Sequence, residues 1–160
     1  MKFEEVRLEV PDGSQLILGQ SHFIKTVEDI YEVLASSMPG IKFGVAFCEA
    51  SGKALVRYDG SDEEAMSSAR NFANLLRAGH CFVVVLRGAF PINVLNRLKD
   101  VEEVAGLFCA TSNPITVVLA ATAEGRGILG VVDGDSTKGT ESEADKKERH
   151  EFLRRIGYKR

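Results

Sequence analysis

One histidine stands where a reactive side chain can be held in place. His80 follows a predicted helix that ends at Gly79, and it directly precedes the apolar run Cys81 to Leu86. A side chain at such a junction is fixed by the strand and still reaches the end of the sheet. Because imidazole titrates near neutral pH, it can act as a base or accept a phosphoryl group. A structural histidine bonded to a backbone carbonyl is an equal alternative.

The other nucleophilic and ligating side chains give His80 no obvious partner. Cys81 is its neighbour in the chain, and successive strand residues point to opposite faces. Cys109 can pair with His80 only if their strands are adjacent, and a small buried thiol is the simpler interpretation. His22 and His150 fall in a loop and a charged helix, and no HExxH or CxxC spacing occurs. The sequence therefore predicts no histidine-based metal centre.

Two asparagines and an arginine recur at helical spacing after the apolar run. Asn93, Asn96, Arg97 and Asp100 fall at positions i, i+3, i+4 and i+7, so one helix would present them on one face. Asparagine is a poor helix former, and its amide suits hydrogen bonding to a nucleobase or sugar. We expect a binding face here, with a solvated outer face as the common alternative.

Polar groups also follow later strands. Thr111 and Asn113 lie in a strand-end loop, where they can hold a phosphate or ribose or form an ordinary turn. Arg126 lies between glycines, and its planar donors match phosphate oxygens. Asp133 and Asp135 flank a glycine, where an Asx-type turn competes with Mg²⁺ binding through water.

A literal GxGxxG match spans residues 125–130 but does not indicate a dinucleotide site. The glycines of that fingerprint must open a helix, whereas residues 128–132 are Ile-Leu-Gly-Val-Val and predict a strand. No Walker A motif and no GxSxG elbow occurs, so P-loop phosphoryl transfer and serine hydrolysis lose support.

Apolar periodicity and turn chemistry predict the elements that position these residues. We expect an opening hairpin at 6–18, a helix at 26–38, a second hairpin at 41–58, a capped helix at 61–79, a central strand at 81–86, a helix at 91–100, strands at 106–110, 115–121 and 127–132, a mobile loop at about 136–147 and a terminal helix. They predict one mixed α/β domain over residues 1–160, with a mixed β-sheet, two hairpins and flanking helices.

The composition limits the classes of partner that the chain is expected to bind. A net charge of -3 with 27% charged residues of both signs gives no basic surface for nucleic acid or an anionic membrane. The N-terminal residues carry charge and no long apolar run, which favours a cytoplasmic protein. Three widely spaced cysteines indicate reduced thiols. Small molecules or proteins are therefore the expected partners.

Four segments together resemble the adenosine-specific kinase family. They are Gly79-His80, Gly88 to Asn96, Phe108 to Pro114 and Gly125 to Gly134, and the likeness spans nearly the whole chain. The resemblance implies a mixed α/β protein that binds adenosine and AMP in preference to ADP or ATP and is associated with a phosphorylated histidine, here His80.

In that scheme a phosphohistidine would pass a phosphoryl group to or from the nucleoside 5′ oxygen. Arg126 and loop N–H groups would neutralise charge, while Asn93, Asn96 and Asn113 would orient the base or ribose. The phosphate donor and any cofactor, Mg²⁺ included, stay open.

Two alternatives to a phosphotransferase remain at this point. One is a sensor or scavenger of AMP or adenosine without turnover, and the other is a structural homo-oligomer. Short strands and an amphipathic tail leave edges and apolar surface to cover, so we expect a homo-oligomer, a trimer or a hexamer.

Overall fold

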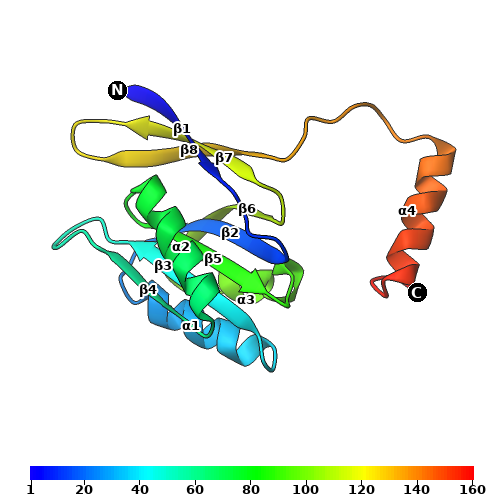
Figure 1. Cartoon of the computed structure of the whole chain (residues 1–160), viewed down its shortest axis with the longest axis horizontal. Helices are drawn as coiled ribbons and strands as arrows, with labels where there is room; N and C mark the ends of the chain where they lie inside the picture. Colours follow the sequence, from blue (N-terminus) through cyan, green and yellow to red (C-terminus); the bar gives the residue numbers. More distant parts are fainter.

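Two antiparallel sheets and the helices beside them build the body of the chain (Figure 1). The computed structural model describes residues 1–160. The strands are β1 Lys2–Leu8, β2 Ser14–Ser21, β3 Lys42–Cys48, β4 Val56–Gly60, β5 Cys81–Arg87, β6 Val104–Thr111, β7 Ile115–Ala121 and β8 Arg126–Asp133. The helices are α1 Thr26–Ser37, α2 Glu63–Leu76, α3 Leu95–Lys99 and α4 Glu143–Arg155, with a 3-10 turn at Pro91–Asn93.

The strand orders are β1-β7-β8 in the smaller sheet and β4-β3-β5-β2-β6 in the larger. The mixed α/β single domain is confirmed. The predicted mixed β-sheet is wrong, because the strands form two sheets in which all pairings are antiparallel. Strand β5 lies at the centre of the larger sheet, and residues 81–86 are buried throughout. Their unbroken apolar sequence predicts this position, because both faces of a central strand are covered.

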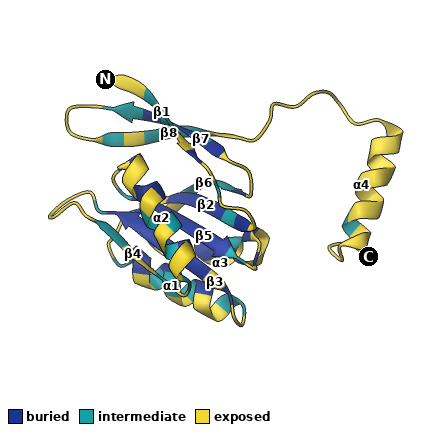
Figure 2. Cartoon of the chain, viewed as in Figure 1, coloured by how far each residue is buried: buried dark blue, intermediate teal, exposed yellow.

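Two hydrophobic cores flank the larger sheet (Figure 2). Helix α2 lies between the two sheets, where its small and aromatic residues Ala65, Ala69, Phe72, Ala73 and Leu76 are buried. Helices α1 and α3 cover the opposite face, and Ile30 and Leu34 of α1 are fully buried there. Side chains alternate along a strand, so neighbouring residues of β3 and β5 contribute to different cores.

The predicted opening hairpin is wrong, because β1 and β2 belong to different sheets. Strand β1 pairs with β7, whereas β2 lies between β5 and β6. The turn at 11–13 sends the chain from one sheet to the other. The apolar run at 16–18 is buried on both faces, which requires an interior position that a hairpin with the half-exposed β1 would not give.

Three local predictions also need correction. The helix cap is Asp62, which accepts from the N–H of Ala65 at 3.1 Å, while Ser61 donates to the carbonyl of Ile41. The expected helix at 91–100 breaks at Val94 into a 3-10 turn and the short α3. The expected mobile loop at 136–147 is too long, because a capping box at Ser142 starts α4 at residue 143.

Candidate functional site

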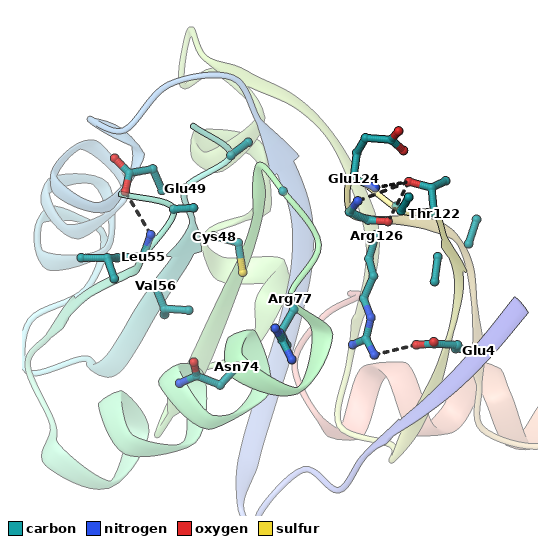
Figure 3. Close-up of a pocket in the computed structure, with 18 residues that line it drawn as sticks. Glu4, Cys48, Glu49, Leu55, Val56, Asn74, Arg77, Thr122, Glu124 and Arg126 are labelled. Atoms are coloured by element: carbon teal, nitrogen blue, oxygen red, sulfur yellow. Dashed lines mark hydrogen bonds and ion pairs between the residues drawn. The ribbon is translucent and has the colours of Figure 1, made fainter. Parts of the chain in front are cut away.

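A cavity of about 1030 Å³ opens where two hairpin loops approach the end of α2 (Figure 3). Its walls are residues 48–50 and 54–56 of the β3–β4 hairpin, Asn74 and Arg77 at the end of α2, Gly79, residues 120–127 of the β7–β8 hairpin, and Glu4 of β1. The volume is at the upper end of the range for small-molecule pockets. The cavity is therefore large enough for a nucleoside monophosphate.

The predicted phosphate-binding residue Arg126 lines this cavity but already has partners. Its guanidinium forms an ion pair with Glu4 at 2.6 Å and donates to the carbonyls of Leu75 and Leu76 at 3.1 and 3.3 Å. Those carbonyls lie at the C-terminus of α2, where the helix leaves oxygens without partners and favours a cation. Arg126 therefore ties the smaller sheet to α2, and a phosphate would have to displace Glu4 to reach it.

The cation that is free in this cavity is Arg77, which was not predicted from the sequence as a site residue. Arg77 ends α2 in a left-handed conformation, with φ 50°, and its N–H donates to the carbonyl of Ala73. Its exposed side chain forms no ion pair or hydrogen bond within the chain, and Figure 3 shows it beside Arg126 at the cavity. The available signal was an arginine at the end of a predicted helix, three residues before His80.

Two further acidic residues face the cavity in different electrostatic states. Glu49 accepts from the N–H of Leu55 at 3.0 Å and from Arg57 at 3.1 Å. The Leu55 N–H and then the Arg57 guanidinium lower the pKa of Glu49, so this carboxylate is ionised and neutralised locally. Glu124, in the β7–β8 turn, is exposed and forms no ion pair. One free guanidinium and one free carboxylate thus remain to meet a ligand.

His80 does not line the cavity, although its neighbour Gly79 does, and its ring lies on the other face of β3. Its N–H donates to the carbonyl of Cys48 at 2.7 Å, and its carbonyl accepts from the N–H of Ser21 at 3.0 Å. The half-buried ring stacks on Phe47, with centroids 5.9 Å apart. Phe47 belongs to the core beneath α1, whereas Cys48 belongs to the core around α2 and lines the cavity.

The backbone of His80 is strained. Its φ of 64° lies in the left-handed region, which costs a non-glycine residue roughly 1–2 kcal/mol. Such conformations persist where the surrounding structure enforces them, and they cluster at functional sites. Cys109 lies on β6, which pairs with β2 and not with β5, so no adjacent strand brings this thiol to His80.

Thr111, Asn113 and Asp133 do come together, as a closed hydrogen-bonded cluster. The Thr111 hydroxyl and the Asn113 amide both donate to Asp133 Oδ1, at 2.8 and 3.1 Å. The N–H of Asn113 donates to the Thr111 hydroxyl at 3.0 Å. Asp135 instead pairs with Lys138 at 3.3 Å. These bonds clamp the ends of β6 and β8 and use polar groups that a ligand or Mg²⁺ would need.

Comparison with known proteins identifies the family. The family model described as adenosine specific kinase matches residues 6–159. The chain belongs to the adenosine-specific kinase family. No match was found among curated proteins. The crystal structure of the PH1918 protein from Pyrococcus horikoshii OT3 is 42% identical, with a TM-score of 0.96 over 99% of this chain and 98% of that one.

The structure does not bring the other predicted site residues together around His80. Asn93 accepts from the N–H of Phe90 and so closes its own turn, whereas the exposed Asn96 side chain forms no hydrogen bond within the chain. Arg97 donates to the carbonyl of Ser36 at 3.0 Å and so caps the end of α1.

These residues also lie far from His80 along β5. Thr111 is level with Val85 across β2, and the 91–97 segment follows the end of β5 at Arg87, whereas His80 precedes its start. At about 3.3 Å per residue, a seven-residue strand separates its two ends by roughly 20 Å. Within one chain, the predicted residues therefore divide between two ends of the larger sheet.

Two general features complete the description of the chain. No helix is both long and apolar enough to cross a lipid bilayer. The chain holds no group of three or more histidine, cysteine, aspartate or glutamate side chains arranged to bind a metal ion.

Proposed function

We propose that this member of the adenosine-specific kinase family binds adenosine or AMP in the cavity beside the β3–β4 hairpin, and that His80 is a phosphoryl acceptor. The family match supports the substrate class. The location of the binding site is inferred from one observation, the unpaired Arg77 guanidinium in a cavity of about 1030 Å³. A planar guanidinium binds a phosphate through paired N–H donors.

The charge of the cavity favours a ligand with few phosphates. Of its two arginines only Arg77 is free, because Arg126 is bound to Glu4 and to the end of α2. A single cation offsets about half of the charge of one phosphate and a much smaller share of the charge of a triphosphate, and the free Glu124 would repel further anionic groups. The same carboxylate suits ribose hydroxyls, which donate hydrogen bonds.

Three features support the acceptor role of His80. Its ring is half-exposed, its plane is held by Phe47, and its strained backbone is fixed by bonds to two strands. A side chain held in this way loses little freedom when it accepts a phosphoryl group. Because the ring and the cavity lie on opposite faces of β3, ligand binding and phosphorylation are separable properties with separate tests.

Calorimetric titration with adenosine, AMP, ADP and ATP tests the binding site. We expect Arg77→Gln to weaken AMP at least tenfold and to leave adenosine within twofold, because adenosine lacks the phosphate. Arg70→Gln is the matched control, since Arg70 lies on the same helix but stacks on Tyr58. If none of the four ligands gives a heat of binding, the proposal that the chain binds a nucleotide is wrong.

Intact mass and labelling with phosphate donors test the acceptor. The variant of choice is His80→Asn, because asparagine tolerates the left-handed conformation better than most residues. We expect a mass increment of one phosphate on the wild-type protein that maps to His80 and is absent from the variant. Phosphate that persists in His80→Asn would contradict the acceptor role.

A second candidate function is an AMP or adenosine sensor without turnover. The orientation of the His80 ring, away from the cavity, favours this alternative. It holds if the ligands bind to wild type and to His80→Asn equally while no donor labels the wild-type protein.

A further inference from the structure

Two of the three cysteines lie side by side at one end of the larger sheet. The register of β3 and β5 pairs Phe47 with Phe82, and one residue further along it places Cys48 opposite Cys81. The chain segments are still bonded at this point, because the N–H of His80 donates to the carbonyl of Cys48 at 2.7 Å. Opposite residues of an antiparallel pair project from the same face of a sheet. Both cysteines accordingly belong to the core around α2.

The two thiols are in direct contact, and the contact makes them unequal. The Cys81 thiol donates a hydrogen bond to the Cys48 sulfur, which lowers the pKa of Cys48. The same bond, and then burial, raise the pKa of Cys81. Because the thiolate is the nucleophilic form of cysteine, Cys48 is the more reactive member of the pair.

The spacing of opposite strand residues suits a disulfide. Their Cα atoms are about 4.5–5.5 Å apart in antiparallel sheets, and disulfides join Cα atoms that are about 4.4–6.8 Å apart. Cys48 is the last residue of β3, and Cys81 is the first residue of β5. The exposed loop at 50–55 follows almost directly after Cys48, so the chain beside this cysteine can adjust when a bond forms.

The cavity beside α2 gives Cys48 a route to small molecules. Cys48 lines this cavity of about 1030 Å³, and Figure 3 shows its sulfur directed toward the end of α2. Cys81 is 2% exposed and does not line the cavity. A small oxidant that enters the cavity therefore meets Cys48 first, and Cys81 lies behind it. Such an arrangement of an accessible thiol and a resolving thiol is typical of redox-sensing cysteines.

We propose that Cys48 and Cys81 are a redox-active pair, which hydrogen peroxide converts into a reversible intramolecular disulfide. The Cys48 thiolate attacks one peroxide oxygen, the O–O bond breaks, and the hydroxide that leaves takes up the thiol proton as water. The Cys81 sulfur then attacks the resulting sulfenic acid, which loses its hydroxyl group as a second water. Two thiols and one peroxide thus give one disulfide and two waters. A dithiol reductant reverses the reaction by thiol exchange.

The disulfide would change the wall of the cavity. The Cys48 thiol donates to the carbonyl of Ala73 at 3.5 Å, and the same carbonyl accepts from the N–H of Arg77. Oxidation removes this thiol donor at the end of α2. It also closes a loop that contains β4 and α2, which restricts the unfolded chain. The inference rests on the cysteine geometry and does not depend on the proposed function.

Peroxide treatment of the folded full chain tests the pair. Intact mass should fall by two hydrogens, about 2 Da, and peptide mapping without reduction should find a crosslink between Cys48 and Cys81. Dithiothreitol should restore the original mass, and the oxidised chain should unfold at a higher temperature than the reduced one. Cys109→Ser is the matched control and should form the same crosslink, because Cys109 lies on β6, which is not adjacent to β3 or β5.

Two further variants test the order of the steps. Cys81→Ala should accumulate a Cys48 sulfenic acid that dimedone traps, whereas Cys48→Ala should slow oxidation of Cys81 at least tenfold. Circular dichroism before treatment checks that each variant is folded. If either variant fails to fold, the crosslink in the wild-type chain still decides. A folded wild-type chain that forms no crosslink between Cys48 and Cys81, or that crosslinks through Cys109 instead, overturns the proposal.

Discussion

The imidazole of His80 lies on the ring of Phe47, with centroids 5.9 Å apart and ring planes inclined by 17°. Phe47 is only 1% exposed and is packed in the core beneath α1, so its plane is set by the fold. The backbone bonds of His80 to Cys48 and Ser21 fix its main chain. One buried ring and two strand ends therefore determine where the imidazole nitrogens point.

Replacing Phe47 by leucine should remove the ring that fixes the orientation of the His80 imidazole. We expect Phe47→Leu to lower the free energy of unfolding by about 1–2 kcal/mol, since it removes buried ring area, and to reduce phosphate incorporation at His80. Phe43→Leu is the matched control, because Phe43 is fully buried in the same core but contacts Tyr31. Equal loss of phosphate in both variants would show that stability, and not ring orientation, controls the site.

Two glycines of similar strand context should respond very differently to alanine. A Cβ on Gly44 would lie 2.3 Å from the N of Met66 and 2.4 Å from the carbonyl of Ala65, which are backbone atoms of α2. We expect Gly44→Ala to destabilise the fold by about 3 kcal/mol or more, because a packed backbone cannot move away cheaply. Gly127→Ala meets nothing within 4 Å and should change stability by no more than about 0.5 kcal/mol. Chemical denaturation of both variants checks the contrast.

The sequence predicts the central elements because their patterns are local. The apolar run at 81–86 predicts a strand covered on both faces, and the structure contains that strand. The helical spacing of Val27, Ile30 and Leu34 predicts a helix with one buried face, and these three residues are buried in α1. Sheet assignment is different, because the pairing of β1 with β7 joins residues more than a hundred positions apart. No local turn signal contains that information, which is why the turn at 11–13 suggested a hairpin.

The residues of the candidate site were likewise predictable from the sequence only in part. His80 was recognisable from its position between a helix and a buried strand, and the family model supports the likeness of the surrounding segments. Arg126 was recognised as a cation in a loop, but its occupation by Glu4 and by α2 depends on packing between the two sheets. Arg77 was missed because only that packing places it in a cavity.

Glu103 should make stability depend on pH. Its side chain is 1% exposed, and neither carboxylate oxygen accepts a hydrogen bond; the nearest cation is Lys25 Nζ at 3.7 Å. Burial, and then the neighbouring Asp29 carboxylate, raise the pKa of Glu103 above its usual value. As pH rises through the interval between the usual and the raised pKa, the unfolded chain ionises first, so folding loses stability.

Glu103→Gln removes this titration. The variant should therefore gain stability relative to wild type as pH rises above about 4.5, and the gain should level off above the raised pKa. Thermal unfolding from pH 4 to pH 8 measures the difference, with Glu102→Gln as a control because the exposed Glu102 also contacts Lys25. A difference between wild type and Glu103→Gln that stays constant over this range contradicts the assignment.

Alkylation of Cys48 should report whether the cavity is occupied. Cys48 lines the cavity, and the adjacent Cys81 thiol lowers its pKa, whereas burial raises the pKa of Cys109 to about 11. Cys48 is only 5% exposed, so iodoacetamide should reach its thiol slowly, at a rate set by local opening of the cavity wall. AMP at ten times its Kd should slow the Cys48 reaction roughly tenfold by mass action and leave Cys109 unchanged. Peptide mass mapping over time follows both sites, and AMP that binds without protecting Cys48 would place the nucleotide elsewhere on the molecule.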